Sequence, residues 1–222
     1  MISVITIDGP SGAGKGTVCQ LVAKSLGLHL LDSGALYRLT ALAAERQGVD
    51  FADTAALARV ARNLDVTFLP QESGTLVQLE GDDVSLAIRQ EQVGMNASKV
   101  AACNDVREAL LQRQRDFARA PGVVADGRDM GTTVFPQAQL KVFLTASAEE
   151  RARRRVLQLQ QGGGNPEFST ILRDIEARDK QDSERTVSPL KPAEDAVLLD
   201  CTDMSIQQVL ERVLELYAQI GE

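Results

Sequence analysis

The sequence predicts an α/β fold built on a parallel β-sheet with helices on both faces. Short apolar runs alternate along the chain with longer segments in which apolar residues recur at helical spacing, as in repeated strand–helix units. Four of the five apolar runs are continuous rather than alternating, which is typical of strands buried on both faces. A glycine-rich turn joins the first run to the first helical segment, at the place where such folds bind ligands.

The expected elements follow one another along the chain. Strands are predicted at 2–7, 28–31, 123–125, 140–144 and 197–199. Helices are predicted at 15–26, 35–47, 53–63, 106–119, 148–160, 168–182 and 205–218.

Residues 65–88 break this rhythm. They alternate as half-buried strands do, with turn composition at 70–74, so we expect a small antiparallel insert. A chain of 222 residues suits one compact domain, 1–222, with room for such an inserted lobe.

Composition narrows the function classes. The net charge of −7 argues against a general nucleic-acid surface. Among the 24 basic residues 18 are Arg, which favours local sites that grip phosphate or carboxylate. Apolar runs are shorter than the ~18 to 20 residues that span a bilayer, and the N-terminus lacks a secretory pattern. We therefore expect no membrane partner and no nucleic-acid partner.

Cysteine usage fits a reducing compartment. Cys19, Cys103 and Cys201 are scattered and lack C-x-x-C spacing, so we expect reduced thiols in a cytoplasmic protein. The single histidine, His29, lies in an apolar run and is expected to pack in a strand rather than to bind a metal.

The glycine-rich turn has the spacing of a phosphate loop. It follows a predicted strand and opens a predicted helix, which is the context a P-loop requires. Its glycines allow a tight turn that brings backbone N–H groups onto phosphate oxygens, and its lysine adds a charge for the β- and γ-phosphates. We expect that lysine to face the ligand rather than to be packed. The residues of this predicted ATP site are Gly9, Pro10, Ser11, Gly12, Ala13, Gly14, Lys15, Gly16 and Thr17.

Gly16 departs from the commonest form of this loop, because the hydroxyl arrives only at Thr17. This GKGT variant resembles nucleoside monophosphate kinases rather than GTPases, and the guanine-reading string N-K-x-D is absent from the sequence. The loop predicts a nucleoside triphosphate donor and leaves the acceptor open.

Two further segments follow predicted strands. Ser33 stands where a helix N-cap is expected, and Arg38 follows about a turn later; a plain cap with an exposed arginine is the alternative. Asp126 ends an apolar strand, where a carboxylate can hold Mg²⁺ through water, and Asp129 can orient a substrate hydroxyl. A turn with two solvated acids is the alternative there.

Ser98 and Arg107 form a third candidate pair. They stand nine residues apart, and a single straight helix would place them on different faces. Asn104 offers a new N-cap, so a helix break there could turn both toward one pocket.

The last third of the chain is rich in arginine around a glycine joint at 162–166. The joint is either a plain loop or the hinge of a lid. Arg178, Asp182 and Arg185 share one helix face if helical geometry continues that far. A solvated salt-bridge stripe is the alternative.

Taken together, the segments GPSGAGKGT, LLDSGALYR and ADGRDMGT, the insert and the arginine-rich last third resemble a bacterial cytidylate kinase over 2–218. The resemblance implies a P-loop kinase fold: a five-stranded parallel sheet, an acceptor-binding lobe at 33–105 that contains the 65–88 insert, and a lid region at 150–186. It implies transfer of the γ-phosphate of ATP to CMP or dCMP, with Mg²⁺, by a monomer.

The resemblance also assigns residues. It implies that Arg154 or Arg155 clamps ATP, that Arg178 and Arg185 bridge the transferring phosphoryl group near Asp182, and that Mg²⁺ is held through water near Asp126 and Thr17. The implied acceptor-binding set is Ser33, Arg38, Ser98, Arg107, Asp126, Arg128 and Asp129.

Two rival functions stay open at this level. One is another P-loop small-molecule kinase, such as a uridylate kinase. The other is a regulatory module that binds nucleotide and transfers nothing, against which the acceptor set weighs.

Overall fold

The computed structural model describes residues 2–71 and 74–220. The chain forms two compact units, one made of Met1–Asp32 with Arg115–Glu222 and the other of Ser33–Gln114. In the described residues no helix is both long enough and apolar enough to cross a bilayer.

The first unit contains a five-stranded sheet in the order β2-β6-β1-β7-β8, with every neighbouring pair parallel. Its inner strands are the most buried, as strands covered on both faces should be. The register places Ile7 opposite Asp126, so the carboxyl ends of β1 and β6 lie side by side. The strands are β1 (Ser3–Asp8), β2 (His29–Asp32), β6 (Gly122–Gly127), β7 (Leu140–Thr145) and β8 (Val197–Asp200).

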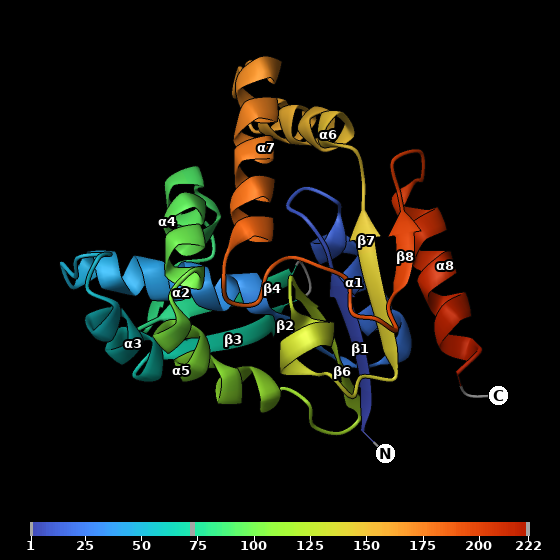
Figure 1. Ribbon diagram of the computed structural model, residues 1–222, viewed down its shortest axis with the longest axis horizontal. Coiled ribbons are helices and arrows are strands. Elements are labelled where there is room, and N and C mark those ends of the chain that lie inside the picture. The colour runs from blue at the N-terminus through green and yellow to red at the C-terminus, as the bar shows by residue number, and fades with distance from the viewer. Residues whose placement is uncertain (1, 72–73, 221–222) are drawn as a thin grey trace. The chain divides into compact units, whose positions relative to one another are not determined.

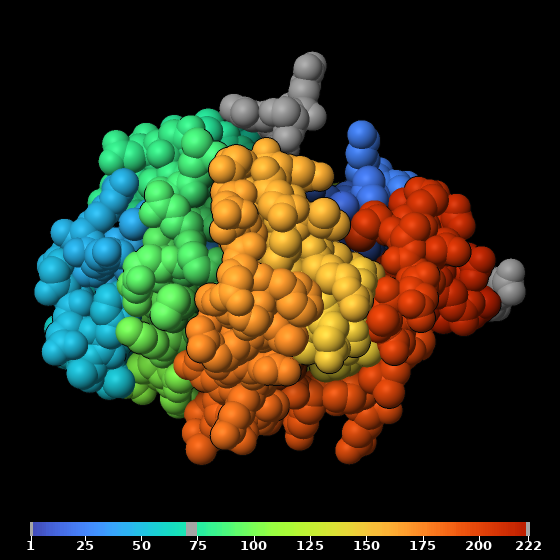
Figure 2. All heavy atoms as spheres, turned by 90° about the horizontal axis from the view of Figure 1, so that it is seen from above, coloured from blue at the N-terminus to red at the C-terminus, as the bar shows by residue number. Residues whose placement is uncertain are grey.

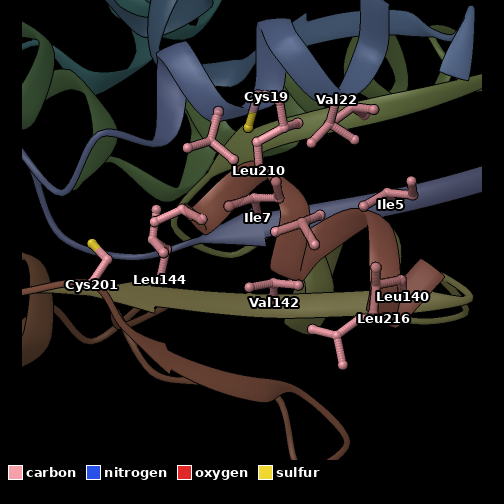
Figure 3. Close-up of a cluster of buried hydrophobic side chains, with 14 of the residues drawn as sticks. Ile5, Ile7, Cys19, Val22, Leu140, Val142, Leu144, Cys201, Leu210 and Leu216 are labelled. Atoms are coloured by element: carbon pink, nitrogen blue, oxygen red, sulfur yellow. The ribbon is translucent and has the colours of Figure 1, made fainter. Parts of the chain in front are cut away.

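Helices α1 (Lys15–Leu26) and α8 (Ile206–Ala218) pack together and share the main core with β1 and β7. Figure 3 shows Cys19 and Val22 of α1 and Leu210 and Leu216 of α8 in one cluster with the labelled apolar side chains of β1 and β7. Burial of each large apolar side chain contributes about 1.5 to 3 kcal/mol, so this cluster holds the start of α1 firmly against the sheet.

Helices α6 (Ala148–Gln161) and α7 (Phe168–Glu184) lie side by side (Figures 1 and 2). Both lie at the carboxyl end of the sheet, as does the loop that connects β1 to α1 (Figure 1). A single turn of π-helix (Met130–Val134) follows β6. This end of the first unit therefore gathers most of the predicted site.

The second unit combines helices with a small antiparallel sheet in the order β3-β4-β5. Helix α2 packs against both α3 and α4. The elements are α2 (Ser33–Arg46), α3 (Thr54–Arg62), β3 (Val66–Gln71), β4 (Gly74–Leu79), β5 (Asp82–Asp83), a short 3₁₀ turn (Ala87–Arg89), α4 (Glu91–Ala101) and most of α5 (Asn104–Arg115).

The predicted parallel sheet and antiparallel insert are both confirmed, and the element ends differ from the prediction by at most four residues. Part of the turn expected at 70–74, residues 72 and 73, lies outside the described residues. Three elements were not predicted: the 3₁₀ turn at Ala87–Arg89, α4 and the π-helical turn. Helix α2 begins at Ser33 itself, so Ser33 opens the helix rather than preceding it. The predicted acceptor lobe, 33–105, falls within the second unit, and the predicted lid, 150–186, within the first.

Candidate active site

The phosphate loop leaves β1 at Gly9, whose φ of 146° lies in the region that favours glycine. A β-carbon at Gly9 would collide with the backbone carbonyl oxygen of Leu144 in β7. The loop ends at Gly14, also left-handed, which caps the start of α1. Backbone geometry thus requires glycine at both ends of the loop. The N-terminus of α1 lies at the end of the loop, and its partial positive charge favours a bound anion there.

Lys15 is buried, and its Nζ donates to the carbonyl oxygen of Pro10 at 2.8 Å. The expectation that Lys15 faces the ligand unpacked is therefore wrong, because the loop folds over its side chain. Burial, and next the charge of Arg128, lower its pKa to about 8, against the attraction of Asp126. Most Lys15 side chains still carry their charge at neutral pH.

Asp126 stands at the end of β6, beside the first turn of α1. Its Oδ2 is 3.5 Å from where a β-carbon would project at Gly16. Burial raises the pKa of Asp126 to about 6, with Lys15 opposing the shift and Asp32 adding to it. Thr17 is exposed on the same turn of α1. The missing side chain at Gly16 thus leaves the Asp126 carboxylate close to the phosphate loop.

Mg²⁺ fits this donor set. The ion usually binds one or two carboxylates and keeps several waters while substrate phosphates complete its shell. Among the described residues no group of three or more His, Cys, Asp or Glu side chains gathers that could hold a metal ion. Asp126 offers one such carboxylate, beside Gly16, which directly precedes Thr17 on α1.

Asp8, the last residue of β1, was missed by the sequence reasoning. Its carboxylate oxygens accept hydrogen bonds from the backbone N–H groups of Met130 and Gly131, each at 2.8 Å. Burial raises the pKa of Asp8 to about 7, although both hydrogen bonds oppose the shift. Asp8 thereby fixes the turn that carries Arg128 and Asp129. Its position at the end of a buried strand, the pattern that identified Asp126, was the available signal.

Three arginines surround the carboxylate of Asp182 in α7. Arg128 donates from Nε to Oδ2 at 2.5 Å, and Arg185 Nη1 is 3.8 Å from Oδ1. Burial opposes the charge of Asp182, but Arg128, Arg178 and Arg185 outweigh it and lower its pKa. Because Asp182 is buried, these contacts are not the solvated stripe considered from the sequence.

Arg185 follows the last residue of α7 in an extended conformation. Its Nε donates to the carbonyl oxygen of Ser188 at 2.6 Å, which turns the guanidinium back toward Asp182. The predicted grouping of Arg178, Asp182 and Arg185 therefore forms, although the helix ends one residue before Arg185.

Arg154 and Arg155 differ in their surroundings. Arg154 donates to Glu150 and to the carbonyl oxygens of Cys201 and Thr202, at 3.0, 2.8 and 3.3 Å. Arg155 donates to the side chain of Gln158 at 2.9 Å. The thiol of Cys201 in turn lies 3.4 Å from the carbonyl oxygen of Ala13. Arg154 thus holds a loop that borders the phosphate loop.

The second unit holds the other predicted residues. Arg38 donates to the carbonyl oxygen of Ile88 at 2.8 Å, and its guanidinium faces Gly94 of α4, where a β-carbon would approach it at 3.1 Å. Ser98 donates to the carbonyl oxygen of the same Gly94 at 3.3 Å. Arg38 and Ser98 therefore converge at one point of α4.

The predicted helix break is confirmed, because α4 ends at Ala101 and α5 begins at Asn104. Arg107 spans the break by donating to Ala101 at 3.0 Å, and its guanidinium lies 5.4 Å from the ring centre of Tyr37. Ser33 donates to Gln114 at 2.7 Å. The predicted acceptor residues thus divide between the units: Ser33, Arg38, Ser98 and Arg107 in the second, and Asp126, Arg128 and Asp129 in the first.

Comparison with known proteins shows which family the chain resembles. The family model described as cytidylate kinase matches residues 5–219. A cytidylate kinase of Saccharophagus degradans is 59% identical over 97% of each chain. Those of Pseudomonas entomophila and Proteus mirabilis are 61% and 58% identical over 95% and 96% of this chain, and over 93% and 95% of their own.

Proposed function

The chain belongs to the cytidylate kinase family and is an ATP-dependent kinase of CMP and dCMP, and we propose how its own residues divide this work. The observation that carries the proposal is the group of three arginines around the Asp182 carboxylate, in the same unit as the phosphate loop. Phosphoryl transfer demands positioning and charge neutralisation more than covalent chemistry, and this arrangement offers both.

The phosphate loop binds the donor. The backbone N–H groups of Gly9 and of 11–17 and the N-terminus of α1 hold the phosphates of ATP, and the Lys15 ammonium moves from Pro10 onto phosphate oxygens. Asp126, near Thr17, would hold Mg²⁺ through water, and the bound ion would supply positive charge that offsets phosphate charge. Arg154 shapes the border of the donor site through Cys201 and Thr202, and Arg155 contributes a mobile charge to it.

Arg178 and Arg185 neutralise the charge of the phosphoryl group during transfer. Asp182 keeps their guanidinium groups in place before the substrates arrive, so little reorganisation is needed at the moment of reaction. The lid region, 150–186, excludes water from the phosphate loop so that ATP is not hydrolysed instead.

The acceptor is itself a phosphate, and its oxygen needs little deprotonation, so no general base is required. Arg38, Arg107 and Arg128 bind its phosphate or sugar as charged donors. Ser98 faces the edge of the cytosine base, Ser33 joins the acceptor set, and Asp129 accepts hydrogen bonds from the base or the ribose.

We also propose that the enzyme works as a monomer in the cytoplasm. The family resemblance supports the monomer, and the thiols of Cys19, Cys103 and Cys201, which form no disulfide, fit a reducing compartment.

A coupled assay of ADP formation over CMP, dCMP, UMP, AMP and GMP tests this function. The proposal predicts the highest kcat/KM for CMP and dCMP. A preference for UMP would favour the uridylate kinase alternative. ATP binding without any ADP formation, whichever monophosphate is added, would favour a regulatory module.

A further inference from the structure

Arg151 differs from the other arginines of α6 because its side chain is buried. Only 5% of it is exposed, whereas 62% of the Arg153 side chain, two residues later, is exposed. A buried guanidinium must find partners for its donors, since an unpaired buried charge is costly. The partners of Arg151 come from three separate segments of the first unit.

The first two partners are backbone carbonyl groups. Arg151 Nε donates to Ala146 at 2.9 Å, just after β7, and Nη1 donates to Ser11 of the phosphate loop at 3.0 Å. The third partner is Asp179 of α7, which accepts from Nη1 at 3.0 Å and from Nη2 at 2.5 Å. One planar guanidinium therefore joins the sheet, the phosphate loop and the lid helix.

The contact with Ser11 has a consequence for phosphate binding. The carbonyl of Ser11 and the N–H of Gly12 belong to one planar trans peptide, so they point in opposite directions. A guanidinium that fixes the carbonyl on one side therefore directs the Gly12 N–H to the other. Gly12 itself is left-handed, and a β-carbon there would lie 3.3 Å from Cβ of Arg151, so loop and arginine are closely packed.

The contact with Asp179 affects the position of Arg178, one of the arginines proposed to neutralise the transferred phosphoryl group. Asp179 follows Arg178 directly in α7 and precedes Asp182 by less than one turn. A bidentate ion pair restricts both the position and the rotation of the helix that carries them. A buried ion pair adds little net stability compared with an apolar pair, so this contact matters more for position than for stability.

We propose that Arg151 is a positioning residue that couples the phosphate loop to the lid helix α7. A single guanidinium sets the direction of a phosphate-binding N–H through Ser11 and the placement of Arg178 through Asp179. The inference rests on the phosphoryl transfer proposed above, and it adds a residue that does not itself touch the substrates.

Two variants separate the halves of this coupling. Asp179→Ala removes the ion pair with the lid helix but keeps the hydrogen bond from Arg151 to Ser11. We therefore expect kcat with CMP to fall about tenfold, while the Kd of ATP alone, measured by calorimetry, changes less than about twofold. Arg151→Lys keeps the charge but loses the planar fork, so it should weaken ATP binding about tenfold and also lower kcat. Arg153→Lys, on the exposed side of the same helix, is the matched control and should change neither.

The double variant Arg151→Lys/Asp179→Ala should have the kcat of Arg151→Lys alone, because both changes break one connection. Melting temperatures of all variants identify any that fail to fold. The inference is overturned if Asp179→Ala lowers only the melting temperature, or if the two effects on kcat multiply. A wild type without CMP turnover would contradict the proposed function instead. In that case the Kd of ATP for the folded Arg151→Lys variant tests the coupling. A Kd equal to that of the wild type would overturn it.

Discussion

At the scale of single residues, the site contains ionisable side chains whose charged forms are disfavoured by burial. The pKa of Lys15 is lowered to about 8, and those of Asp126 and Asp8 are raised to about 6 and 7, each with burial as the largest cause. Such shifts mean that the folded state is less stable than it would be with neutral groups in these places. Groups of this kind cluster where a ligand supplies the missing countercharge.

Replacing Lys15 tests this view of the loop. Because Lys15 is buried, Lys15→Met matches its length without leaving a cavity, and turnover should fall by on the order of 10² to 10³ or more. The variant should be at least as stable as the wild type at pH 7, where the buried ammonium is charged. This gain should shrink as the pH rises from about 8 toward the ordinary value of 10.5, because the folded wild type loses its charge first.

Urea unfolding at pH 7 and pH 9 with a steady-state assay measures both effects. A variant that is less stable at pH 7 would show that Lys15 has a structural role. Unchanged turnover would remove Lys15 from the donor site.

Asp182 should act in the opposite sense on stability. Its pKa is lowered, so its contribution is fully present above the ordinary carboxyl value of 3.8 and is lost as the pH falls below it. Asp182→Asn should lower the free energy of unfolding by about 3 kcal/mol at pH 7, because buried guanidinium groups lose their counter-ion. The difference from the wild type should shrink below about pH 4.

Asp82→Asn is the matched control for this experiment, since its pair with Arg46 is exposed and such pairs contribute about 1 kcal/mol or less. Denaturant unfolding at several pH values decides. An equal loss for both variants would mean that the arginines do not depend on Asp182.

Burial and long-range partners limited the prediction of site residues. The spacing of Gly9, Gly14 and Lys15 identified the phosphate loop because that motif is local. The burial of Lys15 depends on how the loop folds over it, and the role of Asp8 depends on backbone N–H groups more than 120 residues away. Nothing in the arginine run of α6 marks Arg151 as the buried member.

At the scale of elements, two glycines with positive φ separate the cost of a steric clash from the cost of an unfavourable backbone conformation. Gly27, at the end of α1, has φ of 65° and no atom within 4 Å of where a β-carbon would project, whereas a β-carbon at Gly9 meets the Leu144 carbonyl. Gly27→Ala should cost only the conformational term, about 1 to 2 kcal/mol, and should leave ATP binding intact. Gly9→Ala should cost more and abolish ATP binding.

Thermal unfolding and ATP titration of the two variants provide the measurement. Similar losses of stability for both would contradict the tight approach of β1 to β7 at Gly9.

The predicted strands are correct to within one or two residues because continuous apolar runs mark buried strands well. Helix α4 was missed because Gly94, Asn96 and Ser98 are poor helix formers, and packing against α2 overrides their preference. The π-helical turn after β6 was missed because Asp8, from another strand, holds its first N–H groups. Elements set by local pattern were predictable, and those set by tertiary contacts were not.

At the scale of the whole molecule, we propose that this acidic chain of net charge −7 binds its polyanionic substrates through local groups of positive side chains. The first unit supplies the phosphate loop, Lys15 and the arginines around Asp182. The second unit supplies Arg38 and Arg107. Both units thus contain arginines that we propose bind substrate, in line with the excess of Arg over Lys in the composition.

The most direct test of this account is to follow the γ-phosphate of labelled ATP in the presence of CMP. The account predicts that the label appears in CDP and that release of inorganic phosphate stays low, because the lid region excludes water. Label released mainly as inorganic phosphate, or label that stays in ATP, would contradict it.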